Sequence, residues 1–189
     1  MSDPVPLTTR RLVLTAPTGS DVDGIYEACQ DPAIQRYTTV PSPYTRSDAA
    51  SFVALVAEWW QAGTEHVWAV RADDEFVGVV GLHKIHGGSA ELGFWTAASA
   101  RGRGYMTEAA RAVIDFAFGP MRLERLEWRA VVGNTPSARV AQKLGFQFEG
   151  VRRKGLGDHL ASDGTRVRVD AWSAALLPTD PRTDAPWTV

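Results

Sequence analysis

Cysteine is almost absent from this 189-residue chain, which holds a single one, Cys29. One cysteine cannot form an internal disulfide, so a disulfide-stapled secreted scaffold is excluded and we expect a reducing, cytoplasmic location. No apolar run approaches the ~18 residues that a membrane helix requires. Residues 1–4 also lack the charged-then-apolar pattern of a secretory signal peptide. The sequence therefore predicts no association with a membrane.

An excess of positive charge is missing as well. The net charge is −2, from 20 Lys and Arg against 22 Asp and Glu, whereas nonspecific binding of nucleic acid needs a clear basic surplus. Apolar residues at 44% and charged residues at 22% are ordinary for a globular protein with one sizeable core. We expect a single domain over residues 1–177, followed by a proline- and aspartate-containing tail, residues 178–189, that is an extended arm or a loose end.

The most informative stretch is Arg101-Gly102-Arg103-Gly104-Tyr105-Met106-Thr107-Glu108, which stands directly before a helical run. Glycine lets backbone amides approach a ligand closely, and a helix N-terminus adds unpaired N–H groups with a partial positive charge. Together these features predict an anion site, most naturally for a phosphate or pyrophosphate, although a solvated arginine loop is the alternative. The stretch is not a P-loop, because Tyr105 follows Gly104, and Thr107 replaces the third glycine of a dinucleotide fingerprint.

Periodicity elsewhere predicts alternating strands and helices, and therefore an α/β domain with a mixed sheet. We expect strands at residues 11–16, 67–71, 76–85, 90–96, 126–132, 146–152 and 166–175. Four main helices are expected: after the start signal at residues 18–21, from a Ser47 cap to about Gly63, behind the glycine loop, and from Pro136 to Gly145.

The order of these segments resembles the GCN5-related N-acetyltransferase (GNAT) superfamily, and within it the branch of ribosomal-protein N-terminal acetyltransferases. The resemblance begins at Thr9-Arg10-Arg11, includes Asn134-Thr135-Pro136-Ser137 and Lys143-Leu144-Gly145-Phe146, and ends near the last strand. The superfamily's pyrophosphate motif is Gln/Arg-x-x-Gly-x-Gly/Ala. Arg101, Gly104 and Met106 occupy its fixed places, and Met106 departs from the small residue that is usual there. A methionine side chain pointing away from the cofactor would be tolerated.

The resemblance implies acetyl-CoA as the co-substrate, no metal, and a sheet of about seven strands with four main helices. Two parallel strands of that sheet splay apart, and the pantetheine arm inserts between them, where it can pair with otherwise unpaired edge groups. The implied cofactor-binding residues are Phe94, Trp95, Thr96, Arg101, Gly102, Arg103, Gly104, Tyr105, Met106, Thr107, Asn134 and Lys143.

Two residues are candidates for the chemistry of transfer to an amine. An amine attacks a thioester only when it is neutral, and lysine-type and terminal amines have pKa values of about 10 and 8. Glu91 is the candidate base, since it shares a strand face with Gly93 and Trp95 beside the implied cofactor, and the alternative is a structural carboxylate paired with an arginine. Ser137 matches the position proposed in this branch as the acid for the departing thiolate. Its alternative is a serine that caps a helix.

The acceptor side, by resemblance, is the segment between the first strand and the hairpin. We expect Tyr44 and Trp60 to bind the substrate amine, although Trp60 could equally cover the sheet. His83 and His86 lie three apart on a strand and so point to opposite faces, which argues against a metal pair. Asp158 and His159 fall in a loop-like segment.

The leading function is acetyl-CoA-dependent acetylation of a primary amine, on a protein N-terminus or a small molecule. The alternatives are transfer of a larger acyl group, acylation of an antibiotic or metabolite, or acyl-CoA binding without turnover. Neither nucleic acid nor a membrane is expected as a partner, and a homodimer is expected from the resemblance alone.

Overall fold

The computed structural model describes residues 3–161 and 164–187, and within them an eight-stranded mixed sheet carries five α-helices. The strands are β1 (Leu7–Thr8), β2 (Val13–Thr15), β3 (His66–Ala72), β4 (Glu75–His86), β5 (Ser89–Thr96), β6 (Arg125–Val131), β7 (Gln147–Leu160) and β8 (Arg166–Leu176). The helices are α1 (Val22–Ala28), α2 (Pro32–Tyr37), α3 (Arg46–Ala62), α4 (Tyr105–Phe118) and α5 (Thr135–Lys143), with 3₁₀ turns at Gly19–Asp21 and Ala98–Ala100. The sheet has one strand more than expected.

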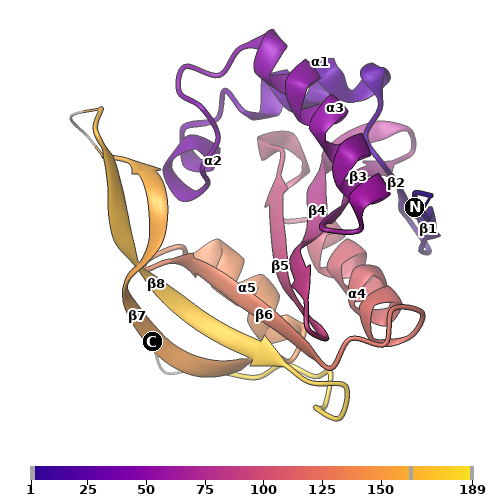
Figure 1. Ribbon diagram of the computed structural model, residues 1–189, viewed down its shortest axis with the longest axis vertical. Coiled ribbons are helices and arrows are strands. Elements are labelled where there is room, and N and C mark those ends of the chain that lie inside the picture. The colour runs from indigo at the N-terminus through magenta and orange to yellow at the C-terminus, as the bar shows by residue number, and fades with distance from the viewer. Residues whose placement is uncertain (1–2, 162–163, 188–189) are drawn as a thin grey trace.

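Strands β5 and β6 form the parallel pair, and they stay together for only three residues each. The ladder runs from Ser89 opposite Arg125 to Glu91 opposite Glu127, and no pairing joins residues 92–96 to residues 128–131 in the described chain. Every other neighbouring pair in the order β1-β2-β3-β4-β5-β6-β8-β7 is antiparallel. Figure 1 shows the two halves of the sheet meeting at one end of β5 and β6 and diverging toward the other. This divergence, called the splay below, confirms the expected fold.

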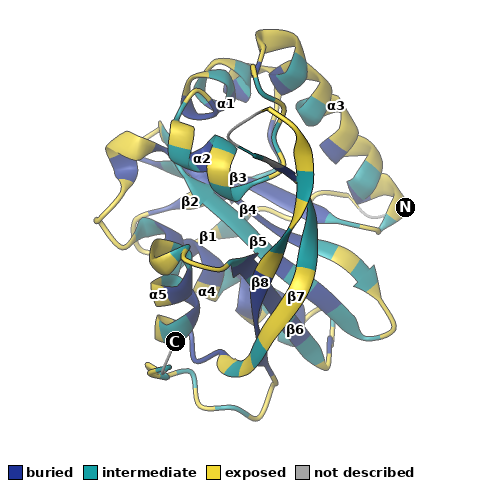
Figure 2. Ribbon diagram, turned by 90° about the vertical axis from the view of Figure 1, so that its left-hand side faces the viewer, coloured by how far each residue is buried: buried dark blue, intermediate teal, exposed yellow. Residues whose placement is uncertain are grey.

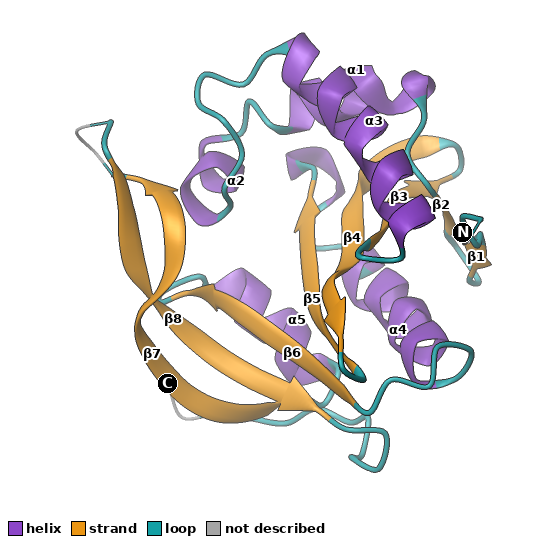
Figure 3. Ribbon diagram, viewed as in Figure 1, coloured by secondary structure: helices purple, strands orange, loops and turns teal. Residues whose placement is uncertain are grey.

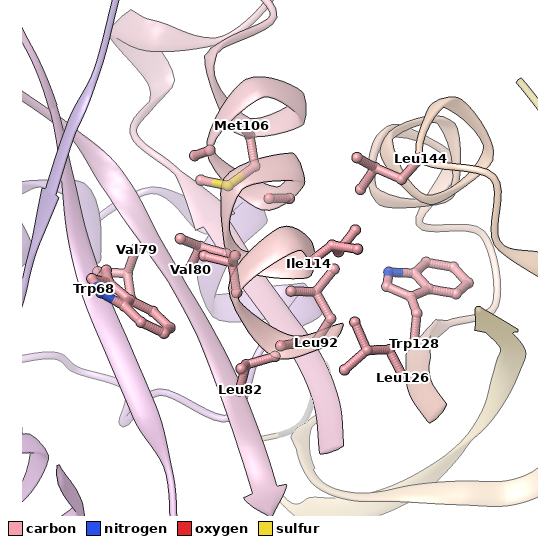
Figure 4. Packing of buried hydrophobic residues seen from close by; sticks show 14 of the residues in the cluster. Trp68, Val79, Val80, Leu82, Leu92, Met106, Ile114, Leu126, Trp128 and Leu144 are labelled. Atoms are coloured by element: carbon pink, nitrogen blue, oxygen red, sulfur yellow. The ribbon is translucent and has the colours of Figure 1, made fainter. Parts of the chain in front are cut away.

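The main core lies between the sheet and α4. Alternation places Leu92 and Leu126 on the face that meets this helix, because successive strand residues point to opposite faces. Figure 4 shows Ile114 of α4 between Leu92 and the pair formed by Leu126 and Trp128, so the helix contacts both halves of the divided sheet. Packing of α4 therefore holds the two halves in place where backbone pairing has ended.

A second apolar cluster lies on the opposite face, under helices α1 to α3, which gather apart from α4 and α5 (Figure 3). Cys29 and Tyr44 belong to this cluster, and Trp95 and Phe76 of the sheet pack against it. Burial raises the pKa of the Cys29 thiol to about 12, against a smaller opposing effect of its hydrogen bond with Tyr44. The thiol is thus protonated and is part of the core.

Local capping differs from the expectation at α3. Thr45, and not Ser47, is the N-cap, because Thr45 and Asp48 form a reciprocal capping box: Asp48 N donates to Thr45 Oγ1 at 3.2 Å and Thr45 N donates to Asp48 Oδ2 at 2.7 Å. Helix α2 was not expected from the sequence. Strand β7 continues to Leu160, so His159 lies in a strand and not in a loop, and it is buried.

The segment after β8 is held against the domain and is not a loose end over its described residues. Trp187 Nε1 donates to Phe146 O at 2.8 Å, and its ring packs against Trp128 and Phe148. Ala185 N donates to the carbonyl of Gln142 at 2.9 Å. This docking covers the end of α5, because an aromatic ring at residue 187 finds an apolar surface that the sheet and helix leave open.

The ribbon of β7 and β8 extends beyond the helices, and Figure 2 shows much of its outer surface exposed. Among the residues that the structure describes, no helix combines the length and the apolar character needed to cross a membrane.

Candidate functional site

The glycine loop leads into an uncapped helix N-terminus. Gly102 and Gly104 both have φ of +76°, a left-handed conformation that side chains disfavour, and Gly104 is the N-cap of α4 with no side-chain cap. The first N–H groups of a helix have no intrahelical acceptor, so those of α4 remain available. A Cβ built on Gly104 meets only Arg11 Nη2, at 3.7 Å, which shows that the loop has open space above it. These features fit a phosphate or pyrophosphate.

Met106 does not obstruct this site. Its side chain is 5% exposed and packs in the main core, as Figure 4 shows. Because it points inward from α4, the first-turn amides face away from it. The departure from the usual small residue therefore leaves the amide contact open.

A groove of about 590 Å³ follows the outer face of α4 and brings Lys143 to the glycine loop. It is lined by Thr8, Thr9, Arg10, Arg11, Gly104, Thr107, Glu108, Arg111, Ala112, Asp115 and Lys143. Lys143 and Arg111 meet here, since Arg111 Nη2 donates to the Lys143 carbonyl at 3.3 Å. Lys143, predicted from its place near the end of α5, thus lines the same groove as Gly104 and Thr107.

The arginines of the loop have different partners. Arg101 Nη1 lies 2.8 Å from Asp31 Oδ2, and Arg101 Nε donates to Thr96 O at 3.2 Å, so this guanidinium braces the loop against α2 and the end of β5. The Arg103 guanidinium lies over the Tyr105 ring, 5.8 Å from its centroid. Arg103 therefore stays beside the helix N-terminus, whereas Arg101 is already committed to protein partners.

Arg11 is a loop neighbour that sequence reasoning missed. Its Nε donates to Glu108 Oε2 at 2.7 Å, its Nη1 donates to Arg103 O at 3.2 Å, and its guanidinium lies 4.7 Å from the Tyr105 ring centroid. No local signal marks it, because Arg11 and Glu108 are 97 residues apart in the sequence. Only the packing of the N-terminal segment on α4 reveals the contact.

Phe94, Trp95 and Thr96 lie on the part of β5 that has lost its partner strand. Phe94 packs on the main core, while Trp95 points to the other face and lies 5.8 Å from Phe76, centroid to centroid. Since the side chains point up and down from the sheet, the backbone edge between them faces the splay. An extended, amide-bearing arm could pair with that edge.

Glu91 lies at the last rung before the splay, and its carboxylate is already bonded. Lys84 Nζ donates to Glu91 Oε2 at 2.8 Å, and the Arg129 guanidinium forms an ion pair with the same oxygen. Burial alone would raise the pKa of this carboxyl, but the hydrogen bonds and charges of Arg129 and Lys84 outweigh it, and the pKa is lowered. These contacts favour the structural alternative for Glu91, and its role as a base stays a prediction.

Ser137 and Asn134 meet at the start of α5, beside β6. Asn134 caps the helix through Oδ1, which accepts from Ser137 N at 3.4 Å. Trp128 Nε1 donates to Ser137 Oγ at 3.1 Å. Because the hydroxyl oxygen accepts from the indole, the hydroxyl proton is free to be donated elsewhere. Trp128 belongs to the part of β6 that faces the splay, so the two sequence-predicted residues are brought to it.

Trp60 is not an acceptor wall. It is 1% exposed, its ring stacks on His66 with centroids 3.9 Å apart, and its Nε1 donates to Val67 O at 3.1 Å. Strand β2 pairs with β3 only from Ala69 to Arg71, so Trp60 satisfies the edge that β2 leaves uncovered.

Tyr44 is corrected in the same way. It is 6% exposed and lies in the apolar cluster under α1 to α3. The spacing of aromatic residues on these segments arises from packing of the core, and no wall of a cleft is formed by this pair.

The sheet face opposite α4 holds further polar groups. A cavity of about 300 Å³ on the β6-β8-β7 half is lined by Arg125, Glu127, Glu149, Gly150, Val151, Arg152 and Ser173. On β4, His83 Nδ1 lies 2.6 Å from Glu65 Oε2, a pair that the sequence did not suggest because its members are 18 residues apart. Within residues 3–161 and 164–187, no group of three or more potential ligands is placed to hold a metal ion.

Comparison with known proteins adds a family model, a related sequence and solved structures of similar fold. The model described as "Acetyltransferase (GNAT) domain" matches residues 11–147. An uncharacterized N-acetyltransferase, p20, from Bacillus licheniformis is 30% identical over 152 residues, which cover 78% of this chain and 85% of that protein.

Two solved structures share the fold. RimL, a ribosomal L7/L12 alpha-N-protein acetyltransferase in complex with coenzyme A, aligns with a TM-score of 0.79 at 20% identity and covers 93% of this chain and 98% of its own. The microcin C7 self-immunity acetyltransferase MccE, in complex with acetyl-CoA and AMP, aligns with a TM-score of 0.78 at 22% identity and covers 89% of this chain and 93% of its own.

Proposed function

The chain belongs to the GNAT acetyltransferase family, and on that premise we propose that it transfers the acetyl group of acetyl-CoA to a primary amine. The observation that carries the proposal is the alignment of two features. The splay between β5 and β6 begins at Glu91, and it opens toward the uncapped N-terminus of α4. An extended arm with a pyrophosphate at its far end matches this pair of features, and acetyl-CoA has both.

The backbone supplies most of the proposed cofactor contacts. The pyrophosphate lies on the amides of residues 103–107, and the arm runs along the edge of residues 94–96. Arg103 and Lys143 supply positive charge, the latter from the α4 groove, and the Asn134 side-chain amide supplies a donor at the start of α5. Acetyl-CoA itself supplies an activated acyl group as a thioester.

Ser137 is proposed as the acid. The neutral amine nitrogen attacks the thioester carbonyl carbon, a C–N bond forms and the C–S bond breaks. The departing thiolate takes the hydroxyl proton of Ser137, and the proton that the nitrogen loses as the amide forms returns to the serine through water. The hydrogen bond from Trp128 supports this direction of transfer, because it fixes the oxygen as an acceptor and leaves the proton to point elsewhere.

The proposed acceptor is a protein N-terminus. The structural similarity to RimL supports it, since RimL is an alpha-N-protein acetyltransferase. The exposed ribbon of β7 and β8, which borders the face opposite α4, offers length for an extended peptide. A small-molecule amine is the second candidate, favoured by the cavity of about 300 Å³ on the same half of the sheet.

Two measurements test the proposal. Thermal unfolding with coenzyme A and with acetyl-CoA reports binding, since a ligand of the folded state raises the melting temperature. An acetylation assay then presents peptides with varied N-termini and a set of small amines, with N-terminally blocked copies of the peptides as controls. We expect stabilisation and transfer to unblocked peptides. Stabilisation without transfer to any amine would favour the binding-module alternative, and absence of both would contradict the cofactor assignment.

A further inference from the structure

His83 and Glu65 form a polar pair that the proposed function leaves without a role. Glu65 stands just before β3 and His83 lies on β4, and their side chains are 22% and 31% exposed. An ionised carboxylate only accepts hydrogen bonds, so its contact with Nδ1 places the imidazole proton there. The lone pair is then on Nε2, and the one hydrogen bond that this ring makes within the described residues is the one through Nδ1.

Two glycines make the room that this imidazole occupies. Gly81 and Gly93 are directly opposite each other on β4 and β5. A Cβ on either would lie 2.9 Å from His83 Nε2, closer than real Cβ contacts come. Neither position has a left-handed backbone that would require glycine. Their lack of a Cβ instead leaves space for the His83 ring. The ring therefore lies over the β4–β5 ladder at the level of Gly93.

The acyl end of an arm inserted in the splay would lie near Gly93. Gly93 is two residues past Glu91, the last residue of β5 that pairs with β6. An arm entering the splay from α4 cannot pass this rung, since the strands close there. An arm that ends near Gly93 would therefore have His83 Nε2 beside it, on the sheet face opposite α4.

The other ionisable groups on this face are already engaged. Glu91 lies directly across the ladder from His83, but Lys84 and Arg129 hold its carboxylate. Glu65 is held by His83 itself. Both carboxylates are thus held through Oε2, whereas the lone pair of His83 Nε2 is bonded to none of these side chains in the described chain.

We propose that His83 is the catalytic base and that Glu65 is its positioning residue, an inference that rests on the proposed acetyl transfer. Nε2 takes one proton from an acceptor ammonium and leaves a neutral amine, which attacks the thioester carbonyl. The nitrogen loses a second proton as the amide forms, and the sulfur takes one proton as the C–S bond breaks. The balance is one proton released to solvent, and His83 passes it on.

The first test is the pH profile of acetyl transfer for His83→Gln, Glu65→Gln and Glu91→Gln, with His86→Gln as the matched control on the same strand. We expect His83→Gln to lower kcat about 100-fold near neutral pH. The deficit shrinks at high pH, where the amine is neutral without help, while the KM for acetyl-CoA stays unchanged. Glu65→Gln is expected to lower kcat by a smaller factor than His83→Gln, because a neutral amide holds the Nδ1 proton less strongly than a carboxylate does. His86→Gln matches the wild type.

A second variant keeps the imidazole but displaces it. Gly81→Ala places a Cβ against Nε2 from β4, away from the splay, and is expected to lower kcat while leaving stabilisation by coenzyme A intact. Wild-type rates in both His83→Gln and Gly81→Ala at every pH would overturn the inference. So would a loss of activity confined to Glu91→Gln.

The last readout does not depend on turnover. The imidazole proton resonance of His83, assigned by its loss in His83→Gln, is titrated by NMR with and without coenzyme A. We expect the resonance to move in Glu65→Gln, which changes the group bonded to Nδ1, and to shift when coenzyme A binds. An unmoved resonance in both experiments overturns the inference. If the wild-type protein acetylates no amine, the proposed function has failed instead, and this titration still shows whether Glu65 controls His83.

Discussion

The glycine loop and the sheet face opposite α4 both border the splay, but they offer different kinds of chemical group. At the loop the binding groups are backbone N–H donors, kept available by two left-handed glycines and the absence of a side-chain cap. On the sheet face the groups are side chains, and Lys84 and Arg129 both hold the Glu91 carboxylate. The loop therefore presents free donors to a ligand, whereas most polar groups of the sheet face are bonded to one another. Among the described residues, Arg129 Nε and the lone pair of His83 Nε2 are not.

This difference determines which substitutions abolish the function of each region. A backbone site survives most side-chain changes and fails when a Cβ is added at a glycine. A side-chain site fails when one partner is removed, because the remaining charge is left buried without compensation. The two regions should thus respond to different substitutions and in different measurements.

The largest expected effect is at the loop. Gly104→Val must adopt φ near +76° and places a branched side chain over the amides. We expect at least a 1,000-fold loss of affinity for coenzyme A, about 4 kcal/mol, measured by calorimetry. Gly87→Val is the matched control, since Gly87 has φ of +57°, open space around it and a place in the β4–β5 turn away from the loop. An equal loss of affinity for coenzyme A in Gly87→Val would show that backbone strain, and not the blocked amides, is responsible.

The next largest effect is a loss of stability at Trp60, a buried residue that belongs to neither region. Trp60→Ala removes a buried ring and leaves Val67 O without its donor, so we expect a loss of about 3–4 kcal/mol in the free energy of unfolding. Leu55→Ala, at a 41% exposed position of the same helix, is expected to change stability by less than about 0.5 kcal/mol. A rise in the KM for the amine without a loss of stability would return Trp60 to an acceptor role.

A third prediction tests whether Glu91 is structural. Glu91→Gln removes the charge facing Arg129, whose Nε already lacks an acceptor among the described groups, and we expect a loss of about 2 kcal/mol at pH 7. Since the pKa of Glu91 is lowered by folding, its contribution is present above the unfolded pKa and is lost as the pH falls through the folded value. The gap between wild type and variant, measured by chemical denaturation, should therefore narrow below about pH 4. A gap independent of pH would argue against the ion pair.

The comparison also explains which features the sequence could predict. The glycine loop could be predicted because its determinants are local: two glycines, flanking arginines and a helical run within a few residues. The alternation of β5 likewise predicted that Glu91 and Gly93 share a face. Such inferences need only the spacing of neighbours along the chain.

Features that depend on strand register and on distant partners could not be predicted from the sequence. His83 pairs with Glu65 and lies over Gly93 because β3, β4 and β5 align as they do, and nothing near His83 in the sequence states that alignment. Trp60 was misassigned for a related reason. An aromatic residue at helical spacing can face a cleft or a sheet edge, and only the short pairing of β2 shows that an edge of β3 needed covering.

The smallest expected effect is at Ser137, which lies at the start of α5 in contact with Trp128 of β6. Ser137→Ala removes the proton donor and leaves the Trp128 indole without its acceptor, but a thiolate is a good leaving group that water can protonate. We therefore expect kcat to fall about tenfold, equivalent to about 1.4 kcal/mol, with binding of coenzyme A unchanged. Ser137→Cys restores a proton donor at the same position and should recover part of the rate, whereas Thr135→Ala at the exposed start of α5 is the control. If Ser137→Ala lowers stability but leaves kcat intact, the serine only supports the helix start and Trp128. Joined to the pH profile of His83→Gln, this result shows whether one proton or two are moved by side chains of the protein.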